Sequence, residues 1–173
     1  MVLSFTAGVI ALAGRLPEDR KVKRDLARRR LDSLGALADG KVVTLRGIVR
    51  DVEGVTTGPV TGRRCVYVRT TEVHGRHADR SERSIPFELE TSDGRIRVVA
   101  SAPRLGVHGE TKQGPDGVTI EHAVPVDAVI TIRGICTYEP DPTRNDVDGV
   151  YRGGERATRP VISGTRKVPL QIG

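Results

Sequence analysis

Residues 86–98 read PFELETSDGRIRV, and this stretch decides the fold class. The Asp-Gly pair at 93–94 favours a tight hairpin turn between two antiparallel strands. Apolar residues alternate with polar ones before the turn, at Phe87 and Leu89, and the alternation resumes after it at Ile96. Alternation of this kind is typical of strands with one buried face. The stretch therefore predicts a β-hairpin packed on a core.

The same signals recur along most of the chain. Short runs rich in Val, Ile and Thr are separated by turns rich in Gly, Pro and Asp. We expect further strands at about 42–50, 65–69, 118–120, 128–135, 161–162 and 168–172, and polar loops or hairpin tips at 75–84, 108–117 and 139–160. No βαβ pattern interrupts these strands. The sequence predicts a mainly β fold, a small antiparallel OB-like barrel or sandwich with one N-terminal amphipathic helix.

That helix is expected over residues 18–38. Pro17, followed by two acidic residues, is a favourable helix start, and Gly40 can end the helix after Asp39. Apolar residues recur between them at roughly helical spacing, at Val22, Leu26, Leu31, Leu34 and Leu37. The pattern predicts an amphipathic helix that lies either on the β-domain or on a bilayer.

The positive charge is concentrated in this N-terminal part. The chain of 173 residues carries a formal net charge of +6, and residues 15–30 hold eight basic side chains against three acidic ones, a net +5. The β-domain is therefore almost neutral, which argues against a phosphate-tracking groove on its body. A basic segment is typical of proteins that contact anionic membranes. The candidate surface-binding residues are Arg20, Lys21, Lys23, Arg24, Arg28, Arg29 and Arg30.

Residues 1–14 contain no charged side chain. As a helix they would rise about 21 Å, less than the roughly 30 Å hydrocarbon core of a bilayer. They fit the trailing part of a transmembrane helix with the basic stretch as its flank, or an apolar segment packed on the domain, or a frayed tail. We divide the chain into residues 1–40, apolar and then basic, and residues 41–173, the β-domain.

One long segment supports a family resemblance. Residues 43–73, VTLRGIVRDVEGVTTGPVTGRRCVYVRTTEV, contain a strand with a central Gly47 and a Pro-Gly turn before Cys65-Val66-Tyr67. The stretch 86–98 and the later stretch 124–139, VPVDAVITIRGICTYE, follow in order. Together they resemble the GIDE-type, or "beside a membrane", domain of MULAN-like membrane RING E3 ubiquitin ligases. The resemblance covers roughly residues 41–172 and implies a membrane-adjacent β-domain.

The chain departs from those ligases in one respect. Two Cys and four His cannot supply the eight ligands of a two-zinc RING. We therefore expect a noncatalytic scaffold or sensory and interaction module, membrane-associated, with an anionic membrane surface or a membrane protein as partner. The alternatives are an OB-like nucleic-acid-binding protein, an accessory part of a ubiquitin-ligase-like enzyme, and a cytoplasmic location. We identify no catalytic residue, cofactor or small-molecule substrate.

Three residue groups are candidate chemical sites. His74 and His77, with Asp79 and with His108 or His122, offer metal-ligand atoms, but their spacing would turn the first two to opposite faces of one strand. Cys65 and Cys136 lie in apolar strand segments without an identifiable base, so we expect reduced, buried thiols. The acidic loop residues (Asp141, Asp146, Asp148 with Asn145) lack EF-hand spacing. We predict surface histidines, structural cysteines and a solvated acidic turn.

Overall fold

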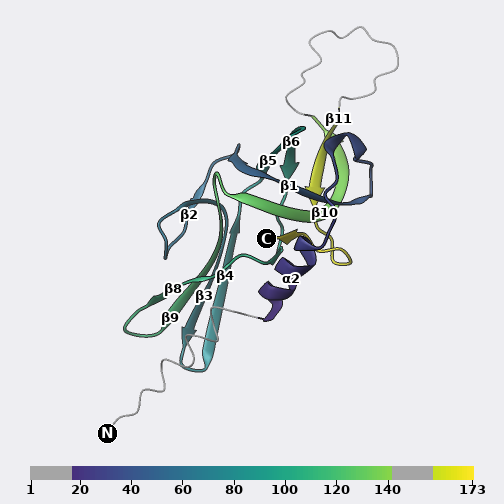
Figure 1. Ribbon diagram of the computed structural model, residues 1–173. Helices are drawn as coiled ribbons and strands as arrows, with labels where there is room; N and C mark the ends of the chain where they lie inside the picture. Colours follow the sequence, from purple (N-terminus) through teal and green to yellow (C-terminus); the bar gives the residue numbers. More distant parts are fainter. Residues whose placement is uncertain (1–16, 142–157) are drawn as a thin grey trace.

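Five strands close into a barrel in the part of the chain that the structure, a computed structural model, describes: residues 17–141 and 158–173. They are β1 (Val42–Asp51), β5 (Phe87–Thr91), β6 (Gly94–Val98), β10 (Val129–Pro140) and β11 (Thr158–Ser163). The strands pair in the order β1-β5-β6-β11-β10, and β10 pairs again with β1, which closes the ring (Figure 1). The expected mainly β fold with a small OB-like barrel is confirmed.

The β5–β6 hairpin has the register that its sequence predicts. Phe87 lies opposite Val98, Leu89 opposite Ile96, and Thr91 opposite Gly94. The apolar members of these pairs are buried in the barrel core. The apolar residues that alternate along the hairpin therefore form the face that points into the barrel.

Two glycines permit the barrel to close. Strand β1 pairs with β10 through Ile48 and with β5 from Ile48 onward, so it bends between two neighbours. A Cβ atom on Gly47 would lie 2.3 Å from the backbone oxygen of Glu90, and one on Gly134 would lie 2.6 Å from that of Ser163. Only glycine allows the backbones to approach this closely.

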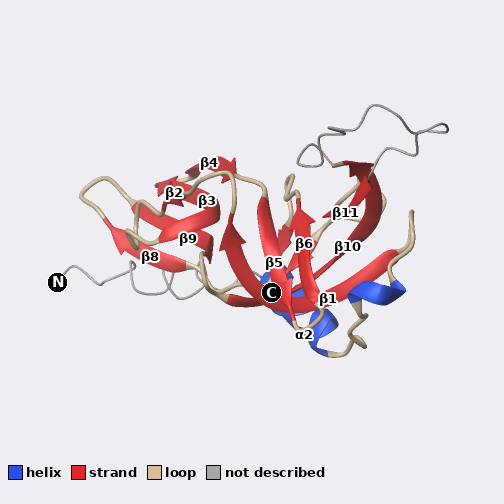
Figure 2. Ribbon diagram, turned by 90° about the horizontal axis from the view of Figure 1, so that it is seen from above, coloured by secondary structure: helices blue, strands red, loops and turns tan. Residues whose placement is uncertain are grey.

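A second sheet extends from the barrel, and we call it the arm. It contains β2 (Thr56–Thr57), β3 (Arg64–His74), β9 (Val118–Pro125) and β8 (Glu110–Gln113) in that order, and β4 (His77–Ser84) also pairs with β3. Strands β2 to β4 come from the connection between β1 and β5, and β8 and β9 from the connection between β6 and β10. Figure 2 shows the arm projecting to one side of the barrel.

Helix α2 (Pro17–Ala27) lies beside the barrel over two short strands, β7 (Arg104–Leu105) and β12 (Gln171–Ile172). A 3-10 turn, η1 (Leu34–Ala36), follows before β1. The predicted helix over 18–38 is wrong beyond Ala27. The N–H of Asp32 donates to the carbonyl of Thr44, and the N–H of Thr44 donates to the Asp32 carboxylate, so the chain leaves the helix to join the edge of β1.

Three strand predictions also need correction. Residues 75–84 were expected to form a loop, but 77–84 are strand β4, although the solvent exposure expected of them is confirmed. The expected tip at 108–117 contains the short strand β8, and the expected strand 168–172 is reduced to β12. Not every pair is antiparallel, because β6–β11 and β7–β12 are parallel. Most of the expected loop 139–160, including Asn145, Asp146 and Asp148, lies outside the described residues.

Candidate functional site

Helix α2 is held on the barrel by one narrow apolar stripe. Val22 and Leu26, one helical turn apart, are only 3% and 4% exposed. A Cβ atom on Gly106 would lie 2.8 Å from the backbone nitrogen of Lys23, and one on Gly173 would lie 2.9 Å from Cδ1 of Leu26. The helix therefore rests almost directly on backbone. The apolar face of α2 is therefore buried against the barrel and is not exposed to solvent.

A buried polar pair adds a second attachment. Nε2 of His122, on β9 of the arm, lies 3.2 Å from Oδ2 of Asp19 on α2, and both side chains are largely shielded from solvent. Burial lowers the pKa of His122 below its ordinary value, against the opposing effect of the nearby Asp19 carboxylate. The neutral imidazole donates its Nε2–H to the carboxylate. This contact fixes the rotation of the helix about its axis.

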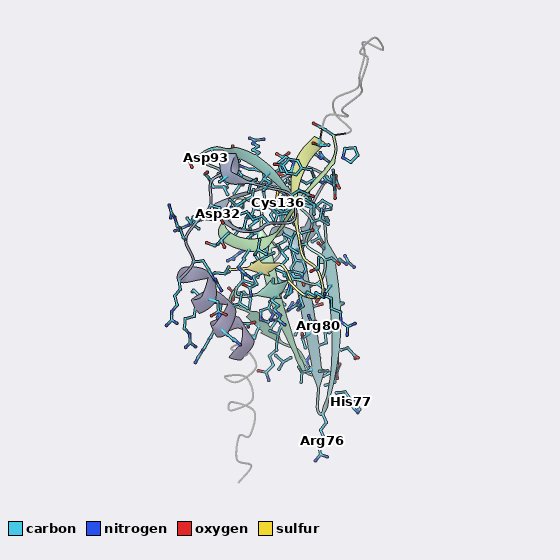
Figure 3. The ribbon with its side chains drawn as sticks, turned by 90° about the vertical axis from the view of Figure 1, so that its right-hand side faces the viewer. Asp32, Arg76, His77, Arg80, Asp93 and Cys136 are labelled. Carbon is cyan, nitrogen blue, oxygen red and sulfur yellow. The ribbon has the colours of Figure 1, made fainter. Side chains whose placement is uncertain are left out.

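The remaining face of the helix points to solvent and carries the charge. All seven candidate residues are exposed: Arg20, Lys21, Lys23 and Arg24 on α2, and Arg28, Arg29 and Arg30 directly after it. We call these seven residues the basic surface. Figure 3 shows the side chains of α2 extending away from the barrel. The structure brings the predicted residues together, although three of them lie beyond the helix end.

The basic surface is not neutralised locally. Over residues 17–141 and 158–173, no salt bridge joins any of its seven side chains to a carboxylate. Residues 15–30 contain three acidic side chains, and one of them, Asp19, is turned inward to His122. Leu31, which follows the last arginine, is 48% exposed instead of packed in a helix as expected. The result is a cationic surface with a large apolar side chain, that of Leu31, at its border.

The outer face of β5 and β6 differs from the basic surface, because its arginines are paired with acidic side chains. Arg50 donates to Glu90 at 2.6 Å and also pairs with Asp127, and Arg95 donates to Glu90 at 3.0 Å. Arg97 pairs with Glu53. In OB-folds the face of the second and third barrel strands is the common nucleic-acid surface. Here the cations on that face are compensated by neighbouring acids.

A buried carboxylate organises the turn that precedes β3. Glu121 accepts hydrogen bonds from the N–H of Val60 at 2.7 Å, the N–H of Thr61 at 3.3 Å and the hydroxyl of Thr61 at 2.7 Å. A Cβ atom on its neighbour Gly58 would lie 2.4 Å from Oε1 of Glu121, so a side chain there would displace this carboxylate. Sequence reasoning missed both Glu121 and the role of His122. Two adjacent ionisable residues among the apolar residues of this strand were the available signal.

The histidines do not form a metal centre in the described part of the chain. His74 and His77 face each other across the β3–β4 hairpin, on two strands and not on one as the spacing argument assumed. Nδ1 of His74 lies 3.0 Å from the backbone oxygen of Asp116, and His122 is buried under α2. No group of three or more His, Cys, Asp or Glu side chains has metal-binding geometry among those described residues.

Both cysteines are buried and unbridged, as predicted. Burial raises the pKa of the Cys65 thiol, and the nearby Glu121 carboxylate raises it further. Burial likewise raises the pKa of the Cys136 thiol. A nucleophilic cysteine needs a lowered pKa. These two thiols are packing groups.

Among the described residues, no helix has the length and apolar character needed to cross a bilayer. Comparison of the chain with protein-family models, with curated proteins and with solved structures found no match. The fold and the geometry of the basic surface therefore carry the functional argument.

Proposed function

We propose that this protein is a noncatalytic, membrane-adjacent β-module that binds an anionic membrane surface through its basic surface. The observation that carries the proposal is the set of seven exposed cations, without salt bridges in the described chain, on one helix and the turn after it. The barrel and arm act as a rigid platform that presents this surface. Scaffolding or sensing near the membrane is the role that such a platform fits.

The structure of α2 determines which kind of membrane contact the proposal requires. Amphipathic helices that insert into a bilayer bury an apolar face among the lipids. In α2 that face is already packed on the barrel through Val22 and Leu26. Binding through α2 must therefore be mainly electrostatic, and Leu31 is the one large apolar side chain exposed beside the cations among the described residues. Electrostatic attachment is reversible and depends on salt.

The magnitudes are adequate for reversible attachment. Each Lys or Arg near an anionic surface contributes about 1 kcal/mol, and the attraction falls off within a Debye length of about 8–10 Å. Three or four simultaneous contacts would give about 3–4 kcal/mol, a partition of a few hundred-fold in favour of the surface. A second attachment point would make the binding stable.

The resemblance to GIDE-type domains supports the same placement, since those domains lie beside membranes. Ligase activity is not part of the proposal, because two Cys and four His cannot form a two-zinc RING in this chain. Nucleic-acid binding is less well supported. The β5–β6 face is charge-compensated. Among the described aromatic side chains, Tyr67 and Phe87 are buried and only Tyr138 is exposed, so there is no row of exposed rings on which bases could stack.

Cosedimentation with lipid vesicles tests the proposal. The chain should pellet with vesicles that contain about one third phosphatidylserine and stay in solution with pure phosphatidylcholine vesicles. Raising the salt to about 0.5 M should release it, because the Debye length falls to about half its physiological value. Equal binding to both vesicle types, or no binding to either, contradicts the proposal. So does a single-stranded oligonucleotide that binds more tightly than the anionic vesicles at the same salt.

A further inference from the structure

Strand β4 forms an open edge of the arm. Among the described residues it pairs only with β3, and all eight of its residues are exposed. Figure 3 shows it running past Arg80 to the hairpin tip at Arg76 and His77, away from the barrel. An edge strand presents unpaired N–H and C=O groups that can template another strand. Proteins commonly protect such edges with charged side chains, especially lysine.

The charges of β4 are of both signs. The sequence Asp79-Arg80-Ser81-Glu82-Arg83 contains two acids and two bases, so the strand carries no net charge. The order is antisymmetric about Ser81. The two neighbours of Ser81 are Arg80, which is positive, and Glu82, which is negative. The next residues outward have the reverse order, with the negative Asp79 before Arg80 and the positive Arg83 after Glu82. A strand with this pattern is complementary to its own reverse.

We propose that β4 pairs with β4 of a second copy of this chain, antiparallel and with Ser81 on the two-fold axis. In this register Arg80 lies opposite Glu82 of the second copy, and Asp79 lies opposite Arg83 of the second copy. The symmetry repeats each pair, so four opposite-charge pairs form across one short interface. Directly opposed residues on antiparallel strands are near enough to interact.

Only the register with Ser81 on the axis places opposite charges against each other at all four charged positions. Two-fold symmetry requires that the residue on the axis faces itself. An axis at Arg80 or Glu82 would place two like charges in direct opposition, and an axis at Asp79 or Arg83 would do the same. Like charges directly opposite each other destabilise a strand pair. The charge order therefore selects Ser81, whose hydroxyl carries no charge, and excludes the neighbouring registers.

In the isolated chain, the two charged residues farthest from Ser81, Asp79 and Arg83, have no salt-bridge partner among the described residues. Asp79 also lies opposite Glu72 on β3, a like charge. Arg80 and Glu82, in contrast, already pair at 2.6 Å within the strand, and Glu82 accepts from Arg69 at 2.8 Å. Most of the new interaction must therefore come from Asp79 and Arg83. An arginine from a second copy would neutralise the acidic Glu72–Asp79 pair.

A charge-swap experiment tests the register. Sedimentation velocity of the parent chain should show a mass that rises with concentration from one chain toward two. Asp79→Arg should weaken this association at least 10-fold, because Arg would face Arg83 of the second copy. It should not impair folding, since the new arginine would lie opposite Glu72. The double variant Asp79→Arg with Arg83→Asp restores opposite charges and should recover association.

Each alternative outcome of that experiment is decisive. A parent chain that remains monomeric up to millimolar concentration overturns the proposal. So does an Asp79→Arg variant that associates like the parent, or a double variant that is folded by circular dichroism yet fails to recover. The vesicle experiment does not depend on these results, since α2 and β4 share no residue.

A cysteine cross-link gives an independent test of the axis. Directly opposed residues have Cα atoms about 4.5–5.5 Å apart, which is within disulfide range. Ser81→Cys should therefore form a disulfide-linked dimer under mild oxidation. Ala78→Cys is the matched control: it is equally exposed on β4, but its two copies would lie about 20 Å apart. Equal cross-linking of both variants, or none with Ser81→Cys, contradicts the proposed pairing. Cys65 and Cys136 do not interfere because they are buried.

Discussion

Asp19 and His122 stand 103 positions apart in the chain, and their side chains meet at 3.2 Å between α2 and the arm. The contact joins the helix that carries the basic surface to the sheet that extends from the barrel. Together with the packing of Val22 and Leu26, it holds the cations in a fixed orientation. The basic surface is therefore part of the folded domain.

The buried histidine makes stability depend on pH. Burial lowers the pKa of His122 in the folded state, so the unfolded chain binds more protons as the pH falls through the unfolded value of about 6.5. We expect the melting temperature to fall between pH 7.5 and pH 5.5, and His122→Gln to flatten this dependence. Thermal melts at both pH values measure the difference.

Other groups do not imitate this effect. The pKa of His74 is raised by its contact with the Asp116 carbonyl, so its contribution has the opposite sign. The pKa values of Glu82 and Glu90 are lowered by their arginine partners, and their contributions change only at pH below about 4.5. A pH dependence unchanged in the His122 variant would contradict the assignment.

The packing of α2 can be separated from its charge. Leu26→Ala should destabilise the protein by about 2–4 kcal/mol, because it removes a buried side chain that packs against Gly173. Leu31→Ala should change stability by less than about 0.5 kcal/mol, since Leu31 is half exposed. Urea unfolding curves give both values. Equal losses would mean that the helix continues through Leu31.

The turn braced by Glu121 should be sensitive to small changes. Glu121→Gln places an amide N–H₂ among hydrogen-bond donors and should cost about 2 kcal/mol. Gly58→Ala should cost at least as much, because its Cβ would collide with the same carboxylate. Gly35→Ala, which has open space around it, is the matched control and should be nearly neutral. Tolerance of Gly58→Ala at the control level would refute this account of the turn.

The cysteines should resist modification while the chain is folded. Cys65 and Cys136 are buried, and burial raises the pKa of both thiols. A thiol reagent should label them only after denaturant is added. Rapid labelling of either thiol under native conditions, measured by absorbance or mass spectrometry, would show that its surroundings are open.

The sequence predicted the elements that bury one face. In the hairpin 86–98 and in strand β10, buried positions alternate with partly buried ones, and the sequence pattern behind this alternation is visible without a structure. Strand β4 was missed because both of its faces are solvated, so it has no apolar period. The two parallel pairs join segments distant in the chain, and local patterns cannot report them.

The candidate site was predictable in charge but not in geometry. The count of Lys and Arg in residues 15–30 reveals the cationic segment directly. The early end of α2 depends on Asp32 reaching Thr44, and its orientation depends on Asp19 reaching His122. Both are contacts between distant parts of the chain, which override local helical periodicity.

The central claim is that the location of the charge, and not its total, causes membrane binding. Two triple variants separate these causes: Arg24→Glu with Arg28→Glu and Arg29→Glu on the basic surface, and Arg63→Glu with Arg76→Glu and Lys112→Glu on the arm and the turn before it. Each lowers the formal net charge of +6 by six, to zero. All six positions are exposed, so both variants should retain the β-sheet circular dichroism signal and the melting temperature of the parent.

The deciding measurement is the partition of these two variants onto phosphatidylserine-containing vesicles at physiological salt. Loss of three contacts of about 1 kcal/mol each predicts binding about 100-fold weaker or more for the basic-surface variant, and within a few-fold of the parent for the arm variant. Equal loss in both variants would mean that net charge alone governs binding. Retention of binding by the folded basic-surface variant would contradict the account outright.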